Sequence, residues 1–266
     1  TLDAEEVAAG QVPDCDGNGV PDECDLRPAL APAPLVTFPI AGTNPYSVAA
    51  ADLDGHGDVD VAAANKTSSD FSVLRNLENS TFAPEVRYPI PSGAAVTAES
   101  RAILAVDLDG DGDADLATQN DRYRGDNHDT TATVFANAGD ATFGLQDTLV
   151  TGGGTRDLVT QDLNGDGLAD LVSTGDDSEE ADVFLNSPAG FAPGTKVALP
   201  FGIAAKFVRL GDLDGDGDAD LIAGASRLGL LRNRGDGAFE IASDTPLDHY
   251  AESGAHGDVD RDGDLH

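Results

Sequence analysis

The sequence predicts an all-β fold made of repeated four-stranded units, the architecture of a β-propeller. Nine-residue acidic blocks begin at positions 52, 107, 162, 212 and 258, so the chain repeats at intervals of 55, 55, 50 and 46 residues. A period near 50 is typical of propellers or solenoids. Short apolar strands and Gly-rich turns fill each unit, and no helical periodicity of useful length occurs, which favours the propeller.

Residues 1–34 precede the repeats and contain one acidic loop of their own. Oxygen-bearing groups stand at positions 1, 3, 5, 7, 9 and 12 of this loop, a spacing suited to calcium. They are Asp14, Asp16, Asn18, the carbonyl of Val20, Asp22 and Asp25. The loop resembles the short calcium loops of thrombospondin type 3 repeats and of dockerins, although both families repeat the loop and this chain shows it once. A plain acidic linker is the alternative.

The two cysteines, Cys15 and Cys24, bracket this loop. In an oxidising compartment they would form a small disulfide clip, whereas in the cytosol they would be thiols or half of a metal site. The calcium-loop chemistry favours the clip. We therefore expect residues 1–34 to form a disulfide-clipped calcium-loop linker that ends in a Pro-rich spacer, and residues 35–266 to form the main domain.

Each unit of the main domain is predicted to contain four strands in the same order. A first strand precedes the acidic block, at Ser47–Ala51, Ala102–Val106, Leu158–Gln161 and Phe207–Gly211. A second strand follows the block, at Val59–Ala63, Leu116–Thr118, Leu171–Thr174 and Leu221–Gly224. A third strand ends in Asn, at Asn76, Asn137, Asn186 and Asn233. A turn and a Phe lead to the fourth strand, and the segment Leu35–Ile40 reads like these fourth strands.

The acidic blocks are predicted to be calcium-binding loops. Oxygen-bearing side chains recur at positions 1, 3, 5 and 9, except at His56 and His266, so a tight loop can wrap a hard cation. Gly at position 4 of the first four blocks and at position 6 of all five permits the positive φ values required. An EF-hand is excluded because position 12 is not acidic, and ordinary solvated turns are the alternative. The expected ligands are Asp52, Asp54, His56, Asp60, Asp107, Asp109, Asp111, Asp115, Asp162, Asn164, Asp166, Asp170, Asp212, Asp214, Asp216, Asp220, Asp258, Asp260 and Asp262.

The order of acidic block, apolar strand, Asn, Gly-Asp turn and Phe resembles the FG-GAP and VCBS repeat family, the calcium-bearing propeller blades also found in integrin α-subunit heads. The resemblance covers four complete blades and a truncated fifth, and it implies part of a seven-bladed ring. It also implies that each ion lies between the first two strands of a blade. Backbone carbonyls at position 7 would then add ligands, from Asp58, Asp113, Leu168 and Asp218. His56 departs from this pattern because imidazole is a poorer ligand for a hard cation, and His266 departs at position 9 of the last block.

Composition narrows the classes of partner. The formal net charge is −34, from 49 acidic and 15 basic residues, which argues against nucleic acid or an anionic membrane. No apolar run approaches the roughly 20 residues of a membrane span, and any export signal would lie outside this piece. No hydrolase, zinc-protease or phosphate-loop motif occurs, so a non-enzymatic protein is expected.

The longest expected insertion, Gln119–Thr131, is predicted to be a contact surface, with Arg122, Tyr123, Arg124 and His128 binding a partner. Its Arg124-Gly125-Asp126 tripeptide matches one that integrins bind, but such a match arises easily in a chain rich in Gly and Asp. The leading prediction is a secreted or cell-surface calcium-binding propeller, part of a longer chain, that mediates adhesion by binding a protein or glycan. The alternatives are an accessory domain of a carbohydrate-active enzyme such as a polysaccharide lyase, and a structural spacer in a large surface protein.

Overall fold

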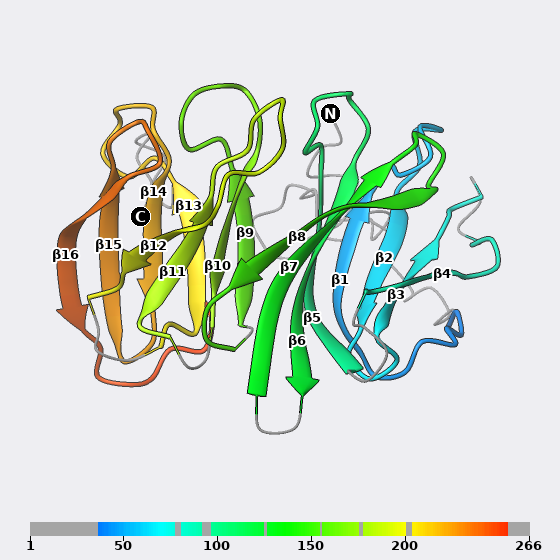
Figure 1. Ribbon diagram of the computed structural model, residues 1–266, viewed down its shortest axis with the longest axis horizontal. Helices are drawn as coiled ribbons and strands as arrows, with labels where there is room; N and C mark the ends of the chain where they lie inside the picture. The colour runs from blue at the N-terminus through cyan, green and yellow to red at the C-terminus, as the bar shows by residue number, and fades with distance from the viewer. Residues whose placement is uncertain are drawn as a thin grey trace, which may run out of the picture. The chain divides into compact units, whose positions relative to one another are not determined.

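In the part of the chain that the structure describes, sixteen β-strands form four antiparallel sheets of four strands each (Figure 1). The computed structural model describes residues 37–77, 81–91, 97–124, 127–154, 156–175, 178–200 and 204–254. The chain divides after Pro39, and all the strands within these ranges belong to the unit that begins at Ile40. Hydrogen-bonded neighbours follow chain order in every sheet, so each sheet is a four-stranded meander, as a propeller blade is.

The four sheets repeat the same strand order. The first contains β1 (Pro45–Ala51), β2 (Asp60–Asn65), β3 (Asp70–Leu74) and β4 (Val86–Pro89). The second contains β5 (Thr97–Val106), β6 (Asp115–Arg124), β7 (Asn127–Asn137) and β8 (Phe143–Thr151). The third contains β9 (Asp157–Gln161), β10 (Asp170–Thr174), β11 (Glu180–Phe184) and β12 (Thr195–Ala198). The fourth contains β13 (Phe207–Gly211), β14 (Asp220–Gly224), β15 (Arg227–Asn233) and β16 (Phe239–Pro246). The prediction of four complete four-stranded blades is confirmed.

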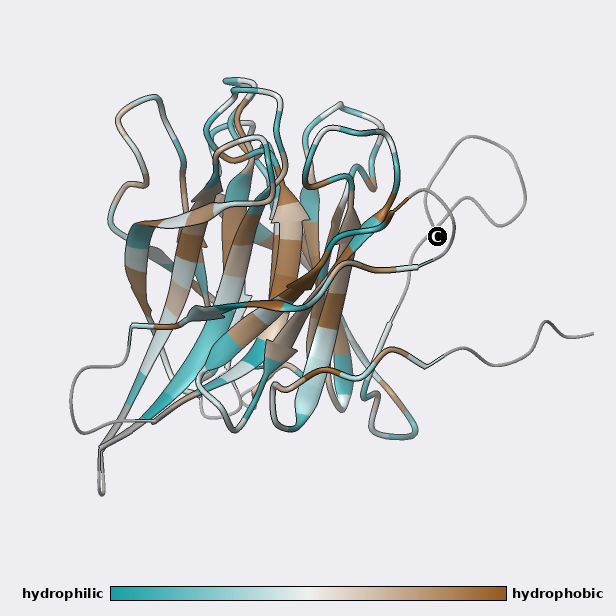
Figure 2. Cartoon of the chain, turned by 90° about the vertical axis from the view of Figure 1, so that its right-hand side faces the viewer, coloured by the Kyte–Doolittle hydropathy of each residue, from teal (hydrophilic) through white to brown (hydrophobic). Residues whose placement is uncertain are grey.

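Successive sheets pack against one another through their first strands and their apolar faces. The strand β1 contacts β5, β5 contacts β9, and β9 contacts β13. Three apolar clusters fill the three interfaces, one between each pair of neighbouring sheets. Figure 2 shows this distribution, with apolar residues along the strands and hydrophilic residues concentrated in many of the connecting loops. The core therefore lies between the blades.

The interface between the first two sheets is built on aromatic rings. Phe71 is fully buried, and its ring centroid lies 5.1 Å from that of Tyr88 and 4.9 Å from that of Phe135 in the second sheet. The Tyr88 hydroxyl donates a hydrogen bond of 2.9 Å to the carbonyl of Ala141, which also belongs to the second sheet's turn. Offset and edge-to-face ring pairs add to the stabilisation from burial alone.

The second sheet is longer than expected, and the predicted insertion Gln119–Thr131 is not a loop. Residues 119–124 continue β6 and residues 127–131 continue β7, in register from Gln119↔Ala132 to Arg124↔Asn127. The strand β5 also begins at Thr97 rather than at Ala102 and pairs with this extension. A polar hairpin next to another strand satisfies its backbone N–H and C=O groups by joining the sheet, and its Thr and Tyr residues favour the extended conformation.

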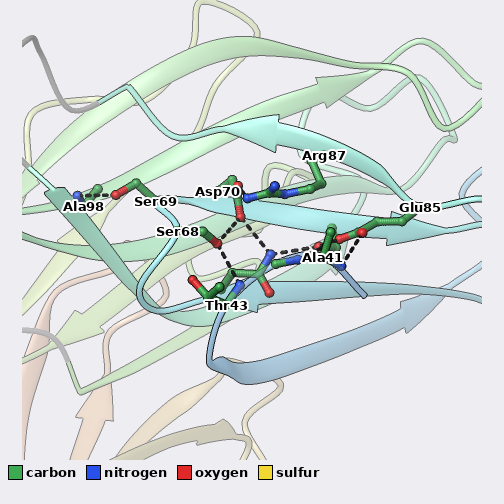
Figure 3. A network of polar contacts seen from close by, with 11 residues as sticks. Ala41, Thr43, Ser68, Ser69, Asp70, Glu85, Arg87 and Ala98 are labelled. Carbon is green, nitrogen blue, oxygen red and sulfur yellow. Dashed lines mark hydrogen bonds and ion pairs between the residues drawn. The ribbon is translucent and has the colours of Figure 1, made fainter. Parts of the chain in front are cut away.

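A network of polar side chains fastens the segment before β1 to the first sheet (Figure 3). The buried carboxylate of Asp70 accepts a hydrogen bond of 2.8 Å from the amide of Asn65 and pairs with Arg87. Glu85 accepts the backbone N–H of Ala41 at 2.6 Å and of Gly42 at 3.2 Å. Burial raises the pKa of Glu85, but its hydrogen bonds and Arg87 outweigh burial and leave the pKa below its usual value. This network holds the chain where it enters the first blade.

The segment Leu35–Ile40 resembles a fourth strand in sequence. Its described part, residues 37–40, forms no strand. The backbone at 41–42 is instead bound to Glu85, which lies beside β4. Within the described ranges, the structure contains no helix long and apolar enough to cross a membrane.

Candidate metal centres

Each of the four described acidic blocks forms the hairpin loop between the first and second strands of its sheet. The four described loops lie between β1 and β2, β5 and β6, β9 and β10, and β13 and β14. This is the position that the family resemblance implied. The fifth block, with Asp258, Asp260, Asp262 and His266, lies outside the described residues. So does the N-terminal loop, with Asp14, Cys15, Asp16, Asn18, Val20, Asp22, Cys24 and Asp25.

The glycines at positions 4 and 6 shape every loop. All eight have positive φ, between 70° and 97°, a conformation that other residues rarely adopt. Their N–H groups turn inward: in the Asp107 loop, Gly110 donates to Oδ1 of Asp107 at 2.7 Å and Gly112 donates to Oδ2 at 3.0 Å. The position-1 carboxylate is thus held by the backbone of its own loop, and Asp162 and Asp212 are held in the same way.

The position-9 carboxylates are buried at the base of the loops. Asp60, Asp115, Asp170 and Asp220 are at most 2% exposed. Each accepts the backbone N–H of the position-2 Leu with Oδ2, at 2.8–3.1 Å. Each also accepts, with Oδ1, the backbone N–H of the Asn at or just beyond the end of the third strand, at 2.6–2.8 Å. The position-9 acid, which closes the loop, therefore also fixes the loop to the end of the third strand.

Three carboxylates converge in three of the loops. Oxygens from positions 1, 3 and 9 lie within 4.8 Å of one another in the sets Asp52, Asp54, Asp60; Asp107, Asp109, Asp115; and Asp212, Asp214, Asp220. In the remaining loop, which begins at Asp162, position 3 is Asn164, so the oxygen available there belongs to a neutral amide. Position 5 is not part of these sets. Asp111 and Asp216 instead accept the backbone N–H of position 7 through Oδ1, at 2.9 and 3.0 Å, and Asp166 does so at 2.9 Å.

The electrostatics of the loops favour a cation. Burial raises the pKa of Asp115, Asp170 and Asp220, against the lowering effect of their backbone hydrogen bonds, and nearby Asp charges raise it further. Burial and the neighbouring Asp111 and Asp107 charges likewise raise the pKa of Asp109. For Asp162 burial acts in the same direction, but four backbone N–H donors outweigh it and lower the pKa. Carboxylates packed this closely repel one another until a positive charge lies among them.

The donor chemistry fits calcium. Every convergent group is an oxygen, the type of ligand that hard cations prefer, and the buried Oδ1 of Asp52 has no hydrogen-bond partner in the described structure. The residues that would hold the ion are those at positions 1, 3 and 9, while position 5 and the carbonyl at position 7 lie on the same loop. The buried Asp triads could therefore hold a metal ion.

Two arginines near the loops were missed by the sequence analysis. Arg232, the residue before Asn233, places Nε 2.5 Å from Oδ2 of Asp214, and Arg75, before Asn76, lies 3.6 Å from Oδ2 of Asp54. In the other two blades this position holds Ala136 and Leu185. The sequence pattern that could have revealed them is Leu-Arg-Asn, which occurs in these two blades at the end of the third strand. In both blades its arginine faces the position-3 acid of the same blade.

The loop with histidine differs from the other three. Nδ1 of His56 lies 2.8 Å from Oδ1 of Asp54, and the imidazole is largely exposed. Asp54 thus faces both His56 and Arg75. These two groups compete with a cation for the position-3 oxygens.

The predicted partner-binding residues lie in the β6–β7 hairpin. Arg122 pairs with Asp129 across the hairpin, Tyr123 pairs with His128, and Arg124 pairs with Asn127. Arg122 is half-buried and donates to the carbonyl of Pro91, so part of its role is structural. The side chains of Tyr123, Arg124 and His128 lie outside the described residues, as does the middle of the Arg124-Gly125-Asp126 tripeptide.

Comparison with known proteins agrees with this fold and these loops. A family model described as an FG-GAP-like repeat matches residues 52–118 and 162–223, which together include all four described loops. The chain therefore carries FG-GAP-like repeats in a β-propeller type of fold, as the motif order indicated. No curated protein matches the chain.

The chain is also similar in structure to a protein from Lactobacillus plantarum whose crystal structure is known. The TM-score is 0.52 at 17% sequence identity, and the similarity covers 80% of this chain. It covers 59% of the other chain, so this chain spans less than two thirds of that protein. At this identity the similarity concerns the fold alone.

The Arg232→Ala variant should bind calcium more tightly in the Asp212 loop. Removing the guanidinium frees the Asp214 carboxylate from a partly exposed ion pair, which is worth about 0.2–1 kcal/mol, so the expected gain is about 1.5- to fivefold in affinity. Calorimetric titration of calcium into the variant measures this gain. Arg234→Ala is the matched control, because Arg234 pairs with Glu240 outside the loop; an equal gain in both variants would contradict the specific role of Arg232.

The metal-free protein should become less stable as pH rises above 3.8, the ordinary pKa of an aspartate. Folding raises the pKa values of Asp115, Asp170 and Asp220 above this value, so the folded state keeps protons that the unfolded state has lost, and stability falls as those protons leave. With saturating calcium the trend should reverse, because protons then compete with the ion. Melting temperatures of calcium-stripped protein across this range test both signs, and Asp115→Asn should flatten the metal-free dependence.

Proposed function

We propose that this chain is a calcium-stabilised β-propeller that acts as a non-enzymatic binding module outside the cell. The observation that carries the proposal is the recurrence of an acidic triad at equivalent positions in three of the four described blades, each with its position-9 acid buried. Burying a carboxylate is costly even when backbone N–H groups bind it, because its negative charge stays uncompensated. A repeat that keeps a buried acid in each of the four described blades is therefore best explained by an ion that balances the charge. Calcium at extracellular concentration is the hard cation that suits such loops.

The ion sites support the fold rather than a reaction. Their position-9 acids connect the loop to the end of the third strand, so an ion bound there strengthens the frame of the blade. A partner surface would then lie on strands that extend beyond the length needed to form the apolar core between the blades. The β6–β7 hairpin contains such strands, because β6 and β7 contain 10 and 11 residues, whereas β10 and β11 in the next blade contain 5 each.

The partner that we assign to this surface is a protein or a glycan. The hairpin tip brings two arginines, a tyrosine and a histidine onto neighbouring positions of a chain that is otherwise strongly acidic. Aromatic and basic groups on a hairpin suit both a sugar ring and an acidic protein patch. The strong negative charge elsewhere opposes nucleic acid and anionic membranes as partners.

Calcium should raise the melting temperature of the protein by a large amount. Each occupied loop contributes RT ln(1 + [L]/Kd), which is about 1.4–2.7 kcal/mol for millimolar ion and a Kd of about 10–100 μM. Differential scanning calorimetry of stripped protein with and without 2 mM calcium (roughly the extracellular level) checks this, with magnesium at the same concentration as the control. A melting temperature that does not respond to calcium would end the calcium proposal.

Replacing residues 123–128 with Asn-Gly should abolish partner binding and spare the fold. The replacement keeps the Arg122↔Asp129 pair and closes it with a two-residue turn that suits a hairpin. Binding is measured on a glycan array and on a panel of immobilised extracellular matrix proteins, and melting is measured in calcium. Loss of binding with unchanged calcium-dependent melting supports the hairpin surface. Retained binding would reject it while leaving the calcium sites in place.

A further inference from the structure

A continuous series of hydrogen bonds runs through the four loops. In each loop the position-9 carboxylate joins the N–H of the position-2 Leu to the N–H of the Asn at the third strand, as described above. The side-chain amide of that same Asn donates to the carbonyl of the position-2 Leu in the preceding loop. This link measures 2.8 Å from Asn137 to Leu53, 2.5 Å from Asn186 to Leu108, and 2.8 Å from Asn233 to Leu163.

Each asparagine therefore contacts two loops at once. Nδ2 of Asn137 also donates to the carbonyl of Ala114 at 3.0 Å, and Nδ2 of Asn186 to that of Ala169 at 3.1 Å, both in the asparagine's own loop. The three asparagines are at most 5% exposed and the three leucines that they contact are 1% exposed. In such dry surroundings a hydrogen bond is strong and the loss of one partner is costly.

We infer that Asn137, Asn186 and Asn233 couple each calcium loop to the one before it, so that the loops bind calcium as a linked series rather than independently. The inference rests on the proposed calcium sites and adds to them a set of positioning residues that touch no ion. From each carboxylate the series passes to the N–H of the position-2 Leu, and from the carbonyl of that Leu to the side-chain amide of the Asn in the next blade. The backbone N–H of that Asn then binds the next carboxylate. This order repeats three times between Asp60 and Asp220.

The physical basis of the coupling is shared ordering. An ion held by Asp170 fixes that carboxylate, which fixes the backbone N–H of Asn186 and, through its side chain, the carbonyl of Leu108. The N–H of Leu108 in turn orients Asp115, a ligand of the preceding loop. A loop whose base is already ordered loses less conformational entropy when it binds its own ion, so occupancy of one loop raises the affinity of its neighbour.

A double-mutant cycle tests the link between the Asp107 and Asp162 loops. The Asp162→Asn change weakens the Asp162 loop, and the affinity of the Asp107 loop is read from the amide resonance of Gly112 during a calcium titration. In the otherwise unchanged protein, Asp162→Asn should weaken the Asp107 loop at least about fivefold. In the Asn186→Ala background the same change should alter that affinity by less than about twofold, because the link between the two loops is removed. The long-range charge effect of Asp162→Asn is common to both backgrounds and cancels when the two are compared.

Asn76→Ala is the matched control background. The amide of Asn76 donates to Val59 in its own loop and has no acceptor in another loop within the described residues, so the fivefold effect should persist there. An equal effect of Asp162→Asn in the Asn186→Ala background would overturn the inference. If the Gly112 resonance of the unmodified protein does not shift when calcium is added, the proposed calcium sites themselves are wrong.

A second measurement keeps the test valid if Asn186→Ala does not fold. With all asparagines intact and at about 1 M monovalent salt, where a Debye length of ~3 Å screens the charge effect, Asp162→Asn should still weaken the adjacent Asp107 loop more than the Asp52 loop. The Asp52 loop is one link further away, and its affinity is read from Gly57. A graded effect supports the series of links. Equal effects on both loops, or no effect on either, would overturn it.

Discussion

The buried carboxylate at position 9 is the interaction on which the rest of each blade depends. One oxygen binds the N–H at the start of the loop and the other binds the N–H at the third strand, so a single side chain joins three segments of the blade. A buried aspartate is stable only if both oxygens are satisfied, and here the satisfying donors come from backbone that the loop and strand must present anyway. The same geometry leaves lone pairs on the carboxylate directed into the loop, where positions 1 and 3 converge. The contacts that hold the blade together therefore also hold this carboxylate where it could bind an ion.

The acidity of the chain follows from this arrangement. Burial, and after it the charges of neighbouring loop acids, raise the pKa values of Asp109 and Asp115, so the charged forms of these acids are disfavoured in the metal-free loop. Two blades offset part of this effect with an arginine placed against position 3, and two place Ala136 or Leu185 there instead. Loops with an internal arginine give up some attraction for a cation but tolerate its absence better. The blades are thus equivalent in shape and different in electrostatics.

Much of the fold and of the loops could be predicted from the sequence because their determinants are local. Ligand spacing, glycines with positive φ and the short flanking strands all lie within about 20 consecutive residues, and the structure shows them where expected. The failures concern contacts between distant segments. The extension of β6 and β7 depends on pairing with the early part of β5, and the position of Arg232 depends on how β15 lies against the Asp212 loop. The asparagines were recognised only as the end of the third strand, because their amides bond to residues 70–84 positions away.

Those distant bonds change how a repeated fold should be understood. In a stack of repeats each unit touches only its neighbours, so stability is a sum of unit terms and interface terms. Here the apolar clusters supply one interface term between blades, and the asparagine links supply a second that passes directly beneath the ion loops. Under the proposed coupling, an ion bound in one blade would act on the interface as well as on its own loop. Because the links repeat at each of the three described interfaces, occupancy and packing would then strengthen each other along the chain, and the array would order as a whole rather than blade by blade.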